Sequence, residues 1–161
     1  MTKIPFVGLH AHSGLSLNDG LGYPQDHMDF AYENGADALA LTDHGHMNGL
    51  PYQVLHARKM KAEGKNFKPI FGVEAYFNPS LEQWRIEYEK AKQEKKKGIK
   101  NDIELSIENE KASKQKVVDI LKKRNHLILI AQNQTGLNNI FKLVSESYKD
   151  ENFYRYPRID Y

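Results

Sequence analysis

The sequence of 161 residues contains no cysteine, which excludes disulfide bonds and thiolate metal ligands. The absence of disulfides fits a reducing compartment, and we expect a cytoplasmic protein. Long hydrophobic runs are also missing, since no stretch approaches the roughly 20 apolar residues of a membrane-spanning helix. The first residues lack the basic and then apolar pattern of a signal peptide. We therefore expect one soluble domain with no membrane partner.

A large excess of charge of one sign is absent too, because 23 Lys and Arg residues face 21 Asp and Glu residues. The balance is uneven along the chain: residues 82–124 hold 13 basic and 9 acidic side chains, and the remainder holds 10 and 12. A basic segment can lie near nucleic-acid phosphates. A run rich in both Lys and Glu is more often a solvated helical hairpin, and we favour this second interpretation.

Short apolar runs alternate with amphipathic segments along the chain. Four runs bounded by Gly, Asp, Asn or His predict buried parallel strands over Phe6–His12, Ala38–Leu41, Pro69–Val73 and Leu127–Ala131. Helical spacing, with a proline at the first start and glycines after the first two ends, predicts helices over Pro24–Asn34, Asn48–Glu63 and Thr135–Lys149. This alternation is typical of an α/β fold.

A charged excursion from about Pro79 to Asn125 interrupts this alternation. Its beginning and end predict amphipathic helices over Glu82–Lys90 and Lys116–Leu121. The polar and weakly periodic segment Lys95–Ala112 predicts a flexible connection between them. The excursion is therefore expected to decorate a core of strands and helices.

His10 and His12 point to the same face if they lie on a strand, because successive side chains of a strand alternate. His44 and Glu74 follow the next two predicted strands, and His126 lies where the fourth strand begins. Ligands gather at the carboxyl ends of parallel strands. Neutral imidazoles suit Zn, Mn or Fe, and a carboxylate can bridge two ions. The pattern therefore predicts a site for more than one metal ion.

Other polar residues near these positions have two interpretations each. Asp43 could bind a metal ion or accept a hydrogen bond that orients a ligand imidazole. His46 could be a turn residue or a substrate contact, and we favour the turn. His27 and His56 fall within predicted helices, where we expect ordinary surface or packing roles.

Several motifs, taken in chain order, resemble those of the PHP (polymerase and histidinol phosphatase) domain. They are His10–Ser13, Asn18–Gly20, Thr42–Gly45, Gly72–Tyr76 and His126–Ala131. The segments Asn133–Leu137, Lys142–Ser145 and Tyr156–Asp160 resemble more narrowly the PHP domain at the N-terminus of the bacterial DNA polymerase III α subunit, a C-family polymerase, in a phage-like version with a charged insertion. The resemblance extends from one end of the chain to the other.

The resemblance implies the N-terminal part of a distorted (β/α)7 barrel with up to three Zn, Mn or Fe ions. The implied ligands, with Glu74 as the bridge, are His10, His12, Asp19, His44, Glu74 and His126. No catalytic residue beyond the ligands is implied. Asp43 is expected to support a ligand without binding the metal ion itself. The implied activity is hydrolysis of a phosphoester by water activated at the metal ions, as a 3′ to 5′ exonuclease acting on the 3′ end of DNA during replication.

The remaining ligands of the family, a Cys, an Asp and a His, come from later strands than this sequence holds. We therefore expect a partial PHP domain over 1–161, with a core of 1–78 and 126–161 and an insertion at about 79–125. The rest of the polymerase or a complementary fragment would be its partner, and the isolated chain would bind metal weakly. Two alternatives remain: a non-catalytic structural or interaction module of the polymerase, and an amidohydrolase-like metal hydrolase, because His-x-His also opens that class of barrel.

Overall fold

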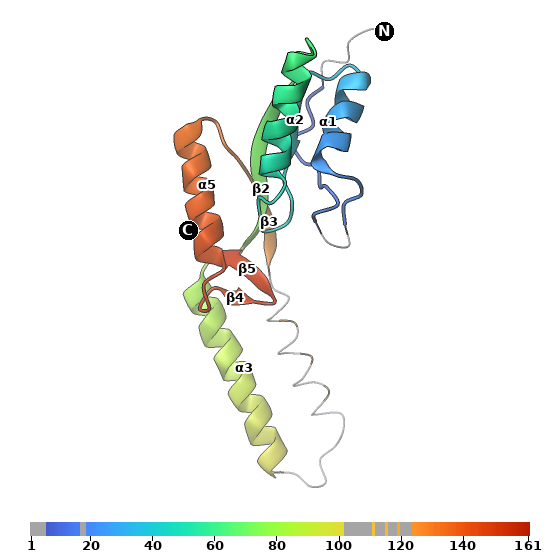
Figure 1. Cartoon of the computed structure of the whole chain (residues 1–161). Helices are drawn as coiled ribbons and strands as arrows, with labels where there is room; N and C mark the ends of the chain where they lie inside the picture. Colours follow the sequence, from blue (N-terminus) through green and yellow to red (C-terminus); the bar gives the residue numbers. More distant parts are fainter. Residues whose placement is uncertain (1–5, 17–18, 102–110, 112–114, 116–118, 120–123) are drawn as a thin grey trace.

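The structure, a computed structural model, describes residues 6–16, 19–101, 111, 115, 119 and 124–161. Helices and strands alternate over much of this part of the chain, and three of the helices lie along the sheet while one runs away from it (Figure 1). In chain order the elements are α1 (Pro24–Glu33), β1 (Ala38–Leu41), α2 (Leu50–Ala62), β2 (Lys68–Phe77), α3 (Leu81–Asn101), β3 (Asn125–Ile130), α5 (Gln134–Ser147), β4 (Phe153–Tyr154) and β5 (Tyr156–Ile159).

The sheet is organised around β2, which pairs with β1, β3 and β5. The first four residues of β2 pair in parallel with β1. Residues Gly72–Phe77 pair antiparallel with β3, and Tyr76 and Phe77 also pair in parallel with β5. Because a strand has only two edges, β3 occupies one edge of β2, and β5 lies on the other. The fold is therefore a mixed α/β fold with a mixed sheet, rather than the wholly parallel sheet that the sequence predicted.

The prediction of a buried parallel strand over Leu127–Ala131 was wrong in direction and in burial. The antiparallel register places Asn125 opposite Phe77, so the chain re-enters the sheet beside the point where it left. An excursion that leaves and returns at one end of a strand reverses the chain direction. The apolar side chains of β3 are partly exposed, with Leu127 at 38% and Ile130 at 37% of full exposure.

The first predicted strand, Phe6–His12, is present only as an extended segment. A single bridge joins Gly8 to Leu39 in parallel, and the amides of Ala40 and Thr42 donate to the carbonyls of Gly8 and Ala11. The segment thus follows β1 without forming a regular strand. It still carries its histidines to the carboxyl end of β1, as the sequence predicted.

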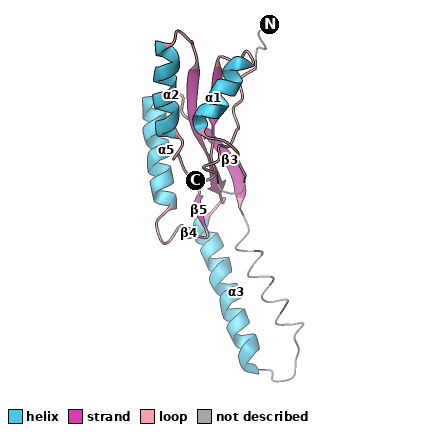
Figure 2. Ribbon diagram, turned by 45° about the vertical axis from the view of Figure 1, so that its right-hand side comes forward, coloured by secondary structure: helices cyan, strands magenta, loops and turns pink. Residues whose placement is uncertain are grey.

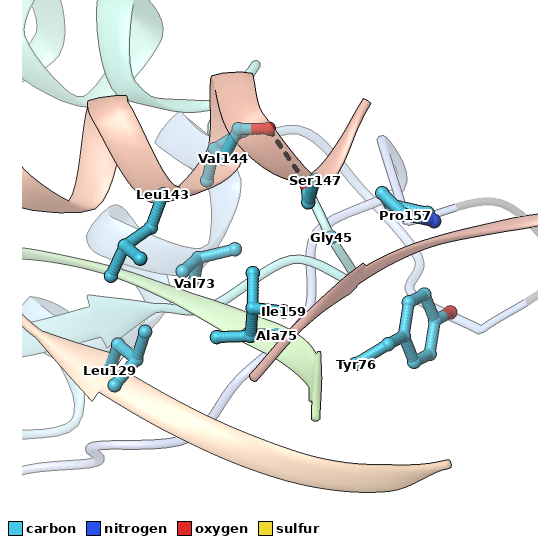
Figure 3. Close-up of a pocket in the computed structure, with 10 residues that line it drawn as sticks. All are labelled: Gly45, Val73, Ala75, Tyr76, Leu129, Leu143, Val144, Ser147, Pro157 and Ile159. Atoms are coloured by element: carbon cyan, nitrogen blue, oxygen red, sulfur yellow. Dashed lines mark hydrogen bonds between the residues drawn. The ribbon is translucent and has the colours of Figure 1, made fainter. Parts of the chain in front are cut away.

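The helices flanking this part of the sheet agree closely with the predicted ranges. Pro24 begins α1, and Asp26 accepts a hydrogen bond from the Tyr23 amide in a capping interaction. Packing of α1 and α2 buries Met28, Met60 and Phe67 in one apolar cluster. A second apolar layer lies between α5 and the strands, where Leu143 and Val144 face Val73, Leu129 and Ile159 (Figure 3).

The helix α3 extends away from the sheet in both views (Figures 1 and 2). Its first turns are anchored to β5: Asp160 accepts a hydrogen bond from the Leu81 amide at 3.0 Å, and the buried guanidinium of Arg158 lies 4.4 Å from the centre of the Trp84 ring. Asp160 therefore satisfies one of the amides that a helix start leaves without a partner within the helix. Both residues belong to the Tyr156–Asp160 motif, whose structural role is to fix this helix.

The remainder of the excursion is described in part. Residues 95–101 continue α3, so the predicted flexible connection was wrong at its start, where the run Lys95–Lys97 favours helix even though Gly98 follows it. The rest of that connection and the helix predicted over Lys116–Leu121 lie outside the described residues, apart from Lys111 and Asp119. Within the described ranges, no helix combines the length and the apolar character needed to cross a membrane.

Candidate metal centre

Glu74 lies at the centre of a cluster of four histidines. Its Oε2 atom is 2.5 Å from His10 Nε2 and 2.7 Å from His12 Nε2. Its Oε1 atom contacts His126 Nδ1 and lies 3.6 Å from His44 Nδ1. The side chain is only 2% exposed, whereas the imidazoles around it reach the surface to different extents. One buried carboxylate on β2 thus contacts histidines from three other parts of the chain.

Asp19 forms a second meeting point beside the first. Its Oδ2 atom contacts His12 Nδ1 and lies 3.0 Å from His44 Nε2. His12 therefore presents one ring nitrogen to Asp19 and the other to Glu74. The six residues predicted as ligands all converge on this one region of the described structure.

The backbone brings these side chains together through the pairing of β1 and β2. His44 lies three residues after the end of β1 and forms an isolated bridge with Glu74 on β2. His126 is held opposite Tyr76 by the antiparallel register of β3. Ser16 Oγ accepts a hydrogen bond from the His44 amide at 2.8 Å and fixes the loop from which Asp19 projects.

Gly20 allows that loop to close. A Cβ atom at this position would collide with the carbonyl oxygen of Ser13, so a larger residue would push Asp19 away from the histidines. The Gly14 amide donates to the Gly22 carbonyl at 2.6 Å and closes the same loop. The Asp-Gly pair of the predicted turn therefore has a steric reason.

Asp43 supports the site by a different contact from the one predicted. Its carboxylate accepts hydrogen bonds from the amide and the hydroxyl of Ser13, at 2.7 Å and 2.9–3.1 Å, and not from an imidazole of the described residues. Asp43 and Ser13 are both buried. Because Ser13 follows His12, the carboxylate fixes the backbone from which a candidate ligand extends.

The pKa values of two histidines in the cluster are shifted in opposite directions. Burial lowers the pKa of His12, but hydrogen bonds with Asp19 and Glu74 outweigh burial and hold this pKa above its ordinary value. Burial holds the pKa of His44 below its ordinary value. Burial would raise the pKa of Glu74, yet hydrogen bonds with the histidines lower it, and the hydrogen bond with His12 lowers the pKa of Asp19. Both carboxylates are therefore held ionised at neutral pH.

The donor atoms fall into three groups that could each hold a metal ion: His10, His12 and Glu74; His12, Asp19 and His44; and His44, Glu74 and His126. Within each group the donor atoms lie within 4.8 Å of one another. Imidazole and carboxylate donors suit Zn, Mn and Fe, and the shared carboxylate suits a bridge between ions. The chemistry of the donor set therefore fits divalent transition metals.

The remaining histidines have structural contacts. His46 Nε2 lies 3.2 Å from the Leu15 carbonyl, and its Nδ1 accepts from the Asn48 amide, as expected of a turn residue. His27 contacts the Leu21 carbonyl, and His56 pairs with Asp29 at 2.8 Å, joining α2 to α1. These contacts agree with the packing roles predicted for them.

Sequence reasoning missed two neighbours of the cluster. Tyr76 stacks on His44 with ring centres 5.6 Å apart and planes within 5°, and it meets His126 edge-on. The guanidinium of Arg124 lies 5.2 Å from the centre of the Tyr76 ring. Tyr76 follows Glu74 by two residues and Arg124 precedes His126 by two, so the alternation rule of strands could have placed both on the ligand face.

Comparison with known proteins gives matches over nearly the whole chain. The family model described as the PHP domain matches residues 8–161. The chain is 37% identical over 156 residues to the DNA polymerase III subunit alpha of Aquifex aeolicus, covering 97% of this chain and 11% of that protein. It is 34% identical over 161 residues to the Treponema pallidum subunit of the same name, covering 99% and 11%.

The chain thus spans about a tenth of the length of these curated relatives. A solved amidohydrolase from Chromobacterium violaceum, with bound sulfate and no metal, is 30% identical over 45% of this chain and 23% of its own, with a TM-score of 0.38. A match at that TM-score does not establish a shared fold. The family model covers nearly the whole chain, and this protein therefore belongs to the PHP domain family.

Proposed function

We propose that this chain is a metal-dependent phosphoesterase domain of the 3′ to 5′ exonuclease type, working within a DNA polymerase III α subunit during replication. The observation that carries the proposal is the convergence of four imidazoles and two carboxylates around the buried Glu74. The similarity to DNA polymerase III subunits supports the assignment to replication. The exonuclease activity is proposed on the basis of these two observations.

In this proposal six residues would hold up to three Zn, Mn or Fe ions: His10, His12, Asp19, His44, Glu74 and His126. Glu74 belongs to two of the three donor groups and is the proposed bridge. Divalent ions at such a site, when bound, supply positive charge for the phosphoryl oxygens and lower the pKa of water. The low pKa of Glu74 keeps this carboxylate ionised for that role.

The residues of the chain prepare the site for a phosphodiester. The side chains of His10, Asp19 and His126 are 56%, 47% and 45% exposed, so a substrate can approach them from solvent. Burial disfavours protonation of His44, which keeps a ring nitrogen available as a donor. Asp43 holds the segment that carries His12 through its hydrogen bonds to Ser13.

The proposed partners follow from the same assignment. The substrate would be the 3′ end of a DNA strand, and the rest of the polymerase, or a complementary fragment, would supply further ligands. We propose a PHP core of 1–78 and 126–161 and an insertion of about 79–125. The direction of β3 supports this division, because β2 and β3 pair as if the excursion between them were a long hairpin loop.

A non-catalytic role within the polymerase is the second candidate. The small donor number favours it: each of the three groups holds three side chains, and such a set binds metal weakly unless further ligands complete it. In this role the domain would support polymerase architecture or bind another subunit. The two candidates differ in their requirement for metal.

Metal analysis and hydrolysis assays distinguish these functions. The chain is purified, its Zn, Mn and Fe contents are measured, and a 5′-labelled single-stranded oligonucleotide is incubated with it before and after chelation. Two or more equivalents of metal with chelator-sensitive shortening from the 3′ end support the phosphoesterase. Metal-free protein that stays inactive when metal is added, alone and within the polymerase, refutes it. Hydrolysis of amides without phosphodiesters would instead indicate an amidohydrolase.

A further inference from the structure

Arg124 lies at the border of the candidate metal centre, held against two tyrosines. The centre of its guanidinium is 4.0 Å from the centre of the Tyr156 ring and 5.2 Å from that of the Tyr76 ring. Tyr76 in turn stacks on His44 and meets His126 edge-on, at 5.6 and 5.4 Å between ring centres. One aromatic ring therefore separates this cation from two candidate ligands.

The strand geometry fixes Arg124 on the side of the metal centre. It immediately precedes β3, two residues before His126, and its contact with Tyr76 places its guanidinium on the side of these ligands. Tyr76 and Tyr156 meet edge-on with ring centres 5.1 Å apart, which gives the guanidinium a continuous aromatic support. The support limits the rotamers that this long side chain can adopt.

The chemistry of this arrangement is that of an anion site. A guanidinium held over aromatic rings can bind a phosphate through its N–H groups in a bidentate manner. A second guanidinium, that of Arg158, is buried nearby. Burial and the charge of Arg124 hold the pKa of Arg158 below its ordinary value. The positive charge of Arg124 at this border favours the approach of a polyanion toward the exposed imidazoles.

We propose that Arg124 is a substrate-binding residue that holds a backbone phosphate of a single-stranded oligonucleotide whose 3′ end lies at the metal centre. The inference rests on the proposed phosphoesterase function and names a contact for its substrate. A purely structural Arg124, packed on the tyrosines without touching DNA, is the competing explanation. The two differ in the salt dependence of DNA binding, because each phosphate contact releases counterions from the nucleic acid.

The experiment measures binding of a fluorescein-labelled thymidine dodecamer with phosphorothioate linkages, which resist hydrolysis, by anisotropy at several salt concentrations with Mn²⁺ present. Wild type is compared with R124Q, R124K and the control R85Q. Arg85 lies on α3, where it donates to Asn152 on the surface, and its loss removes one positive charge away from the cluster. Thermal unfolding of each variant monitors the fold.

The expected result is a dissociation constant about tenfold higher for R124Q, with the slope of log Kd against log salt smaller by about 0.7, the value of one contact to a single strand. R124K should keep the wild-type slope, because it keeps the charge, and bind with intermediate affinity, because it loses the bidentate geometry. R85Q should match wild type. This pattern distinguishes loss of the Arg124 charge from loss of its packing, which a loss of stability alone would not do.

Wild-type binding with a slope that R124Q leaves unchanged overturns the inference, as does a wild type that does not bind the oligonucleotide. If R124Q does not fold, an R124K slope smaller than that of wild type overturns it equally. These outcomes are distinct from failure of the proposed function, which is absence of metal-dependent hydrolysis by wild type. Binding that depends on Arg124 without hydrolysis would retain the contact and remove the phosphoesterase.

Discussion

The Nε2 atoms of His10 and His12 lie 3.1 Å apart, and both face the same carboxylate oxygen of Glu74, at 2.5 and 2.7 Å. Donor atoms bound to one ion at about 2.1 Å are separated by roughly 3 Å. Two imidazole nitrogens and a carboxylate oxygen at these separations are therefore spaced for a shared cation. Among the described residues, Glu74 is the one acidic side chain in this donor group.

The substitution Glu74→Gln should lower metal affinity about 100-fold or more, because it removes the buried charge shared by two donor groups. Metal content after dialysis and calorimetric titration with Mn²⁺ would measure the loss. Glu63→Gln is the matched control, since Glu63 is a surface carboxylate paired with Lys65. Equal metal content in wild type and Glu74→Gln would contradict the assignment of Glu74.

Asp43→Asn should weaken metal binding about 10- to 100-fold although Asp43 is not proposed as a ligand. The amide replaces one of the oxygens that accept from Ser13, and the segment bearing His12 then loses part of its anchor. Because the group is buried, unfolding free energy should also fall by about 1–3 kcal/mol. Calorimetry and urea unfolding test the two effects; Asp29→Asn, which alters a partly exposed carboxylate, should leave metal binding near wild type.

The apo protein should show a pH-dependent contribution from His12. The raised pKa of this group means that its stabilisation is full below its ordinary value of 6.5 and is lost as the pH rises through the higher folded value. In the presence of a chelator, the difference in melting temperature between wild type and His12→Gln should therefore be larger at pH 5.5 than at pH 8.5. A difference that grows with pH would contradict the network with Asp19 and Glu74.

Metal-loaded protein should respond to pH in the opposite sense. A metal ion competes with the proton on His12, so metal affinity should rise between pH 5.5 and 8 and binding should release protons. Calorimetric titrations in buffers of different ionisation enthalpy measure that release. If wild type and His12→Gln release the same number of protons at pH 6.5, metal binding does not remove a proton from His12.

Asp160→Ala should destabilise the protein by about 1 kcal/mol, because the Leu81 amide at the start of α3 loses its acceptor. The effect should appear in urea unfolding followed by circular dichroism. Metal content should stay at the wild-type level, since Asp160 does not contact the candidate ligands in the described structure. Asp150→Ala, an exposed change outside α3, is the control and should unfold like wild type.

The sequence predicted the ligand cluster better than the sheet. His-x-His spacing and polar residues beside apolar runs are local signals, and they indicated His10, His12, His44, Glu74 and His126. The resemblance to the PHP domain added Asp19, and the structure brings all six together. The direction of β3 is not local: the apolar run Leu127–Ala131 has the same composition in either orientation. Its antiparallel pairing depends on where the excursion returns, which periodicity does not encode.

Side-chain contacts outside the ligand set were equally hard to foresee. The interaction of Asp43 with Ser13 rather than an imidazole depends on the path of the loop after His12, which closes through Gly20. The helical continuation of α3 through residues 95–101 was hidden because a polar segment without an apolar stripe resembles a connection. The lysines at 95–97 favour helix, but Gly98 and Asn101 do not, so neither propensity nor periodicity alone predicts that α3 continues there.

The register that places Asn125 opposite Phe77 has a consequence for how such domains can diversify. A segment whose two ends emerge from neighbouring strands can be lengthened, shortened or exchanged while His126 keeps its position opposite Tyr76. Sequence variation could therefore accumulate between these two points at little cost to the cluster. Related domains could therefore carry insertions of different length and sequence at this junction without a change in the metal-binding residues.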